Sequence, residues 1–183
     1  MSLWVCAALL MGAASELSEA LEQATFGARM PGETVSLAGL TRFDGTRFEP
    51  RSLPSKVRVF AFIEPLDRPA GLKRLAWWKA NARSLSERAD VIVVPSASPR
   101  SNAQLEPLIA VDDGDCLLAA RFGAIRLYSG KLGALPLAFV VDDSNIVRAI
   151  VDVEAPADQL VKIDRAVGRL RQQLSEQNIS FGY

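Results

Sequence analysis

Short apolar runs in this chain alternate with stretches whose apolar residues recur every three or four positions. The runs Val57–Ile63, Val91–Val94 and Leu137–Val141 are apolar on both faces, which predicts buried strands. A turn at residues 142–145 separates the third run from a fourth strand, Ile146–Val153. Strands alternating with helices predict an α/β fold, in which the two adjacent final strands form an antiparallel edge.

Three stretches have the period of a helix. The first begins at Pro69, a residue suited to a first helical turn, and a short one spans Asp115–Phe122 before a capping Gly123. A last helix begins at Pro156. The predicted apolar stripes of the first and last helices are Leu72, Leu75, Trp78, Ala82 and Leu85, and Leu160, Ile163, Val167, Leu170 and Leu174.

Two weaker patterns complete the chain. The Asp44-Gly45 pair predicts a hairpin turn between Thr34–Leu40 and Arg47–Phe48. The end of the chain, Ser175–Tyr183, is expected to be loose.

The N-terminal segment divides the chain into residues 1–28, an apolar helix, and 29–183, one domain. Its apolar run Leu3–Ala14 is too short to cross a bilayer, which needs about 20 residues. The run has the length of a signal-peptide core, and it also continues into a helical seam through Leu17 and Leu21. A cleaved signal, a docking helix and a membrane-surface anchor all fit. The segment favours a periplasmic or membrane-associated location over a cytoplasmic one.

Composition excludes several classes of function. The 183 residues carry a net charge of zero, so no basic surface for nucleic acid is expected. The chain has no histidine, which removes the commonest metal ligand and any Ser-His-Asp or Cys-His catalytic group. Two cysteines, Cys6 and Cys116, cannot form a zinc site alone. We expect neither a metal site nor a cofactor.

Four segments, in this order, resemble the thioredoxin-like superfamily, and most of all its peroxiredoxin and membrane-tethered thiol-reductase branches. They are Met30–Thr46, Phe60–Ile63, Asp112–Gly123 and Leu135–Asp142. The resemblance covers about Met30–Leu174 and implies a thioredoxin-like three-layer fold with a central mixed sheet, here preceded by the N-terminal apolar helix. It also implies that Pro136 is cis and faces the turn after the first strand.

That turn, Glu64–Ala70, is where the chain departs from the family. In the family it carries the reactive cysteines, and here it holds none. On the thiol-reductase pattern, Asp67-Arg68-Pro69-Ala70 stands at the Cys-x-Pro-Cys positions; on the peroxiredoxin pattern, Gly71 stands at the peroxidatic cysteine. A carboxylate cannot attack a peroxide or a disulfide, so Asp67 is expected to cap the following helix instead.

Cys116 is the remaining candidate thiol in the domain. Three carboxylates, Asp112, Asp113 and Asp115, lie close to it in sequence and should raise its pKa, which favours a small buried cysteine over an activated one. The sequence therefore favours a protein that is not an enzyme: a redox-inactive, partner-binding accessory protein, assembly factor or structural subunit. The alternative is a divergent peroxidase or thiol oxidoreductase that uses Cys116. A copper-handling module is disfavoured, because histidine and paired cysteines are lacking.

A protein partner is expected through residues 1–28 or through the surface beside the turn. Trp77 lies off the apolar stripe, next to two cations, so it would suit an interface or would pack under a loop. The candidate partner-binding residues are Leu66, Asp67, Arg68, Pro69, Trp77, Leu135 and Pro136.

Overall fold

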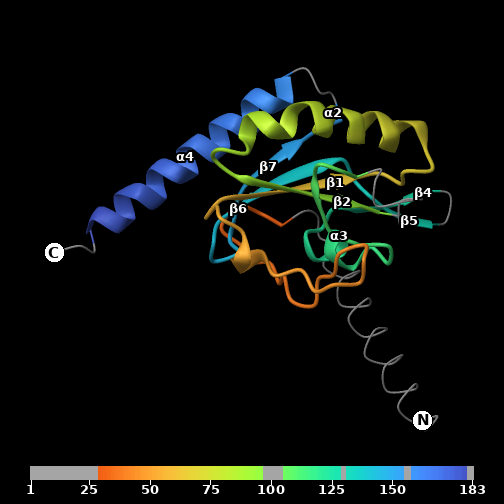
Figure 1. Ribbon diagram of the computed structural model, residues 1–183, viewed down its shortest axis with the longest axis horizontal. Helices are drawn as coiled ribbons and strands as arrows, with labels where there is room; N and C mark the ends of the chain where they lie inside the picture. Colours follow the sequence, from red (N-terminus) through yellow and green to blue (C-terminus); the bar gives the residue numbers. More distant parts are fainter. Residues whose placement is uncertain (1–28, 97–104, 129–130, 155–157, 181–183) are drawn as a thin grey trace, which may run out of the picture.

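Helices cover both faces of one sheet in the computed structural model, which describes residues 29–96, 105–128, 131–154 and 158–180. Figure 1 shows α2 and α4 on one face of the sheet and α3 on the other. The expected three-layer thioredoxin-like fold is therefore confirmed. The expectations for residues 1–28 lie outside the described residues, and no helix within the described ones is long and apolar enough to span a bilayer.

The elements follow one another as η1 (Pro50–Ser52), β1 (Arg58–Ile63), α2 (Pro69–Leu85), β2 (Asp90–Pro95), β3 (Ile109–Ala110), α3 (Leu117–Arg121), β4 (Ile125–Tyr128), β5 (Lys131–Ala134), β6 (Leu137–Val141), β7 (Val147–Asp152) and α4 (Gln159–Ser180). The main sheet has the order β3-β2-β1-β6-β7, and β4 and β5 form a separate hairpin. In the main sheet β1, β2 and β3 are parallel, whereas β6 and β7 run antiparallel to their neighbours.

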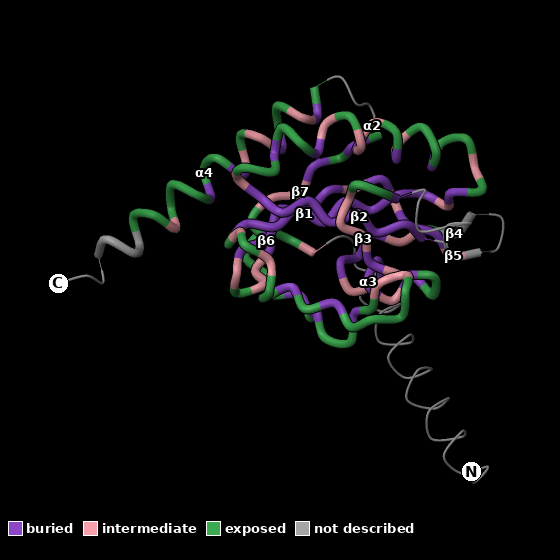
Figure 2. Tube along the Cα trace, viewed as in Figure 1, coloured by how far each residue is buried: buried purple, intermediate pink, exposed green. Residues whose placement is uncertain are grey.

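Strand β1 lies at the centre of the sheet, and all six of its residues are buried (Figure 2). It pairs with β2 along its whole length and with β6 from Arg58 to Ala61. Because side chains alternate between the faces of a strand, Val59 and Ala61 join the core under α2 and α4, while Phe60 and Phe62 join the core over α3. The second core is rich in aromatic rings, with Phe122 and Phe139 centred 4.8 Å apart.

Local structure differs from the predictions in three places. The β4–β5 hairpin was missed, because Arg126 and Gly133 break the apolar pattern that marks a strand. The turn expected at Asp44-Gly45 is present, but its flanking segments form no strands: they pair through one bridge, Thr41 with Arg47, and through the neighbouring backbone hydrogen bonds. Helix α4 runs to Ser180, beyond the expected loose end at Ser175, since no glycine or proline interrupts residues 175–180.

Helix α2 buries a slightly different stripe from the predicted one. Leu75, Trp78, Ala82 and Leu85 are buried as expected, but Leu72 is 44% exposed. Gly71 takes the buried position at that turn, so the helix lies close to the sheet at its beginning.

The difference in burial between Leu75 and Leu72 predicts different losses of stability when each is replaced by alanine. Leu75→Ala should lower the free energy of unfolding by about 2–5 kcal/mol, because it leaves a cavity in the core. Leu72→Ala, one turn earlier, should cost less than about 0.5 kcal/mol. Urea unfolding of the two variants measures the difference, and equal losses would contradict the placement of α2.

Candidate functional site

The turn between β1 and α2 stands at the carboxyl end of the central strand. Arg68 N–H donates to Pro65 O at 3.0 Å, and Leu72 N–H donates to Arg68 O at 3.2 Å, so the chain folds directly into the helix. The residue that caps α2 is Arg68, and no side chain accepts a hydrogen bond there. The expectation that Asp67 caps this helix is therefore wrong: Pro69 in the first turn leaves one N–H fewer to satisfy.

Gly71 packs against the backbone of this turn. A Cβ atom at residue 71 would stand 2.4 Å from Pro65 O and 2.6 Å from Glu64 O, closer than real contacts allow. Residue 71 is the position aligned with the peroxidatic cysteine, and backbone atoms of the turn lie too close to it for a Cβ atom. A side chain fits there only if the turn moves.

A buried ion pair fixes the turn to the sheet. The Glu64 carboxylate accepts two hydrogen bonds from the Arg74 guanidinium, at 2.8 and 2.9 Å, in the planar two-point arrangement that suits arginine. Arg74 also donates to Val153 O, and Val153 N–H donates to Pro136 O at 2.9 Å. These contacts bring the turn and the Leu135-Pro136 segment to the same end of the sheet, as the sequence predicted.

The sequence reasoning missed Glu64 and Arg74. A carboxylate directly after an apolar strand, with an arginine ten positions on in the next helix, was the available signal.

The Leu135-Pro136 peptide bond differs from the family expectation. The cis peptide bond in the described part of the chain is Glu106-Pro107, so the bond before Pro136 is trans. Leu137 N–H donates to Leu135 O at 2.8 Å, which makes Pro136 the centre of a three-residue turn. Pro136 is buried there rather than open to a ligand.

The expected partner-binding residues differ in exposure. Asp67 and Pro69 are exposed, Arg68 and Leu135 are half-buried, and Leu66 is buried in the core under α2. Trp77 is half-buried, packs against the core under α2 and meets the edge of Trp78, with ring centres 4.9 Å apart. Their role in binding stays a prediction.

Cys116 lies at the same end of the sheet as the turn, on the opposite face. Its thiol donates to Ser96 O at 3.8 Å, and Ser96 N–H donates to Ile63 O, the last residue of β1, at 3.1 Å. The side chain is 3% exposed, which confirms the predicted small buried cysteine. Burial, and then the charges of Asp113 and Asp115, raise the pKa of the thiol to about 12.

Asp113 holds the first turn of α3. Cys116, which precedes this helix, has a left-handed backbone (φ 60°) and offers no side-chain cap. The buried Asp113 carboxylate instead accepts hydrogen bonds from Leu118 N–H at 2.7 Å and Ala119 N–H at 2.9 Å. Burial raises its pKa to about 7, although these two hydrogen bonds act in the opposite direction.

Metal-ligating side chains are not clustered in the described part of the chain. Within the described ranges no group of three or more histidine, cysteine, aspartate or glutamate side chains is arranged to hold a metal ion. The chemistry that this end of the sheet offers is that of one thiol, one buried carboxyl group and the Glu64–Arg74 pair.

Comparison with known proteins identifies solved structures that share this fold. No protein-family model and no curated protein matches the chain. Among solved structures, peroxidoxin BcpB from Mycobacterium tuberculosis is similar with a TM-score of 0.62 at 23% identity, over 78% of this chain and 96% of that one. A thiol peroxidase from Chromobacterium violaceum has a TM-score of 0.62 at 17% identity, over 80% and 90%. The bacterioferritin comigratory protein of Xanthomonas campestris, described for its alkyl peroxide reduction activity, has a TM-score of 0.55 at 20% identity, over 76% and 89%.

These neighbours contradict the expectation of a redox-inactive accessory protein. The structures that share this fold are peroxidoxins, peroxiredoxins and thiol peroxidases, which favour the alternative of a divergent peroxidase. At 17–23% identity the likeness establishes the fold of this chain and not its substrate.

The contact of Gly71 with the turn predicts an unusual substitution effect. Gly71→Ala should lower the free energy of unfolding by more than about 2 kcal/mol, because the clash with Pro65 O outweighs the better helix propensity of alanine. Gly168→Ala in α4, where a Cβ meets nothing within 4 Å, should raise it by about 0.5–1 kcal/mol. Thermal unfolding separates the two variants, and stabilisation by both would contradict the close approach at residue 71.

The raised pKa of Asp113 predicts a dependence of stability on pH. The folded chain holds the Asp113 proton more tightly than the unfolded chain, so this contribution is full below pH 4 and is lost as the pH rises to about 7. Between pH 4.5 and 7.5 the wild type should lose about 3 kcal/mol relative to Asp113→Asn, which cannot titrate. The measurement is the free energy of unfolding in urea, taken for both proteins across this pH range. If it changes equally with pH in both, Asp113 does not have a raised pKa.

Proposed function

We propose that this protein is a slow thiol peroxidase in which Cys116 is the reacting group. The proposal is supported by the fold, which is that of peroxidoxins and thiol peroxidases, including one protein described for alkyl peroxide reduction. The observation that carries it is the place of Cys116, hydrogen-bonded to Ser96 O at the carboxyl end of β1 and β2.

The choice of Cys116 rests on what the turn lacks. Glu64–Ala70 contains no cysteine, and Gly71 leaves no room for a side chain. In the proposal the reacting sulfur has therefore moved from the α2 side of the sheet to the α3 side, while staying at the same end of β1. Cys116 is the thiol that the described residues offer.

The reaction is a two-electron reduction of a peroxide. The Cys116 thiolate attacks one peroxide oxygen, an S–O bond forms as the O–O bond breaks, and the leaving alkoxide takes up a proton as an alcohol or water. Cys116 is then a sulfenic acid. An added low-molecular-weight thiol displaces water to give a mixed disulfide, and a second thiol restores the cysteine.

The environment of Cys116 sets the rate. With a pKa of about 12, roughly one thiol in 10⁵ is ionised at pH 7, since each pH unit changes the ratio tenfold. Burial also requires the peroxide to reach a side chain that is 3% exposed. The protein should therefore react far more slowly than an enzyme whose thiolate lies at an exposed helix start.

The test is peroxide-dependent oxidation of Cys116 in the intact protein. Cumene hydroperoxide should produce a sulfenic acid that a dimedone probe traps at Cys116 by mass spectrometry, with a rate that rises about tenfold per pH unit between pH 7 and 9. Cys116→Ser should abolish turnover with excess thiol, and Cys6→Ser should leave it unchanged. Turnover equal in Cys116→Ser and wild type, or no oxidation of Cys116, would overturn the proposal.

A further inference from the structure

Arg58 is a buried cation without a carboxylate in contact. It begins β1, at the end of the sheet away from Cys116, and its side chain is 2% exposed overall. One Arg58 Nη atom donates to the backbone oxygen of Asp142 at 3.3 Å and to the Asn145 side chain at 3.5 Å, both long, while Nε has no partner. A buried charge that is neither paired nor fully hydrogen-bonded is costly, so Arg58 would be stabilised by a further acceptor group.

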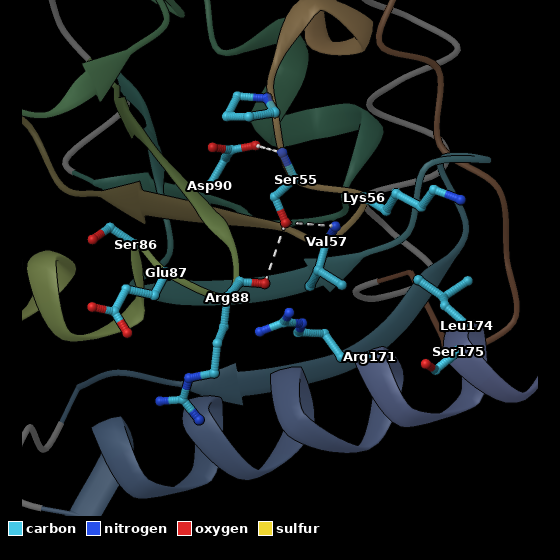
Figure 3. Close-up of a pocket in the computed structure, with 11 residues that line it drawn as sticks. Ser55, Lys56, Val57, Ser86, Glu87, Arg88, Asp90, Arg171, Leu174 and Ser175 are labelled. Carbon is cyan, nitrogen blue, oxygen red and sulfur yellow. Dashed lines mark hydrogen bonds between the residues drawn. The ribbon is translucent and has the colours of Figure 1, made fainter.

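Two of the three carboxylates whose charges act on Arg58 accept hydrogen bonds from other groups. The two oxygens of Asp142 accept hydrogen bonds from the backbone of Ser144 and Ile146 and from Arg148. One oxygen of Asp90 accepts a hydrogen bond from Ser55 N–H at 2.9 Å (Figure 3). The third carboxylate, Asp143, lines the hollow beside Arg58, and none of the three forms an ion pair with Arg58 in the described part of the chain.

An open hollow of about 570 Å³ lies against this cation. Three basic side chains line it, Arg51, Lys56 and Arg58, and Asp143 is the acidic residue among its lining residues. Arg51 and Lys56 are exposed and form no ion pair within the described part of the chain. Figure 3 shows the Lys56 ammonium directed away from Glu87 and Asp90, so these acids do not neutralise it.

The cations also repel one another. Burial is the main cause that lowers the pKa of Arg58, the charges of Asp143, Asp90 and Asp142 raise it, and the charge of Arg51 lowers it by a smaller amount. Like charges held around one hollow are stabilised by an anion between them, and arginine suits the two-point geometry of phosphate oxygens.

We propose that the hollow lined by Arg51, Lys56 and Arg58 binds a phosphate-type oxyanion, either free or carried on a larger molecule. The Arg58 guanidinium, which lines the hollow, would donate to one oxygen after a small side-chain shift, because its Nε–H is buried without a partner, and the two exposed cations would close over the anion from outside. The site is independent of the peroxidase proposal, because β1 separates it from Ile63 by roughly 16 Å of strand.

The test uses the full chain and inorganic phosphate at low millimolar concentration, with sodium chloride at matched ionic strength. Phosphate should shift the nuclear magnetic resonance signal of Arg58 Nε–H and bind with saturation. Lys56→Gln should weaken binding about tenfold, because one charged contact is lost. Asp143→Asn should tighten binding, since it removes the repelling charge.

Lys73→Gln, which removes an exposed cation on α2, is the matched control and should leave binding unchanged. Adenosine monophosphate distinguishes the two sources: tighter binding than phosphate indicates a phosphate on a larger ligand, and equal binding indicates the free anion. Failure of both to bind, or an equal effect of Lys56→Gln and Lys73→Gln, would overturn the proposal. All these variants are exposed or half-buried, so the fold of the protein should survive them.

Discussion

The central strand, β1, is the element on which the rest of the molecule depends. Its six residues are buried, it is paired on both sides, and it supplies apolar side chains to both cores. Such a strand cannot shift without exposing one core or the other. The residues at its two ends are therefore held in place. At one end stand the Glu64–Ala70 turn and the contact through Ser96 to Cys116; at the other stands the unpaired guanidinium of Arg58.

The sequence predicted the parts of the fold in which one physical signal dominates. Val57–Ile63 is apolar on both faces, which only a central strand of a layered sheet satisfies, and Pro69 starts a helix because its ring suits the first turn. The β4–β5 hairpin could not be found in the same way, since its pairing depends on the partner strand rather than on its own apolar content.

The candidate site was predicted less completely, for a related reason. The raised pKa of Cys116 was predicted from its acidic neighbours, and its burial from the usual place of a small unactivated cysteine, and the structure agrees with both. The pairing of Glu64 with Arg74, ten positions on, left a weak signal in the sequence, because a carboxylate follows the apolar strand and an arginine lies in the next helix. That Asp113 rather than Asp67 holds a helix start, and that Pro136 is trans, depend on local backbone geometry that residue types alone do not fix.

The close approach at Gly71 also limits how this chain can change. Any side chain at residue 71 would meet Pro65 O and Glu64 O. A substitution there is tolerated only together with a displacement of residues 64–65, so residue 71 and the turn before it can change only in concert.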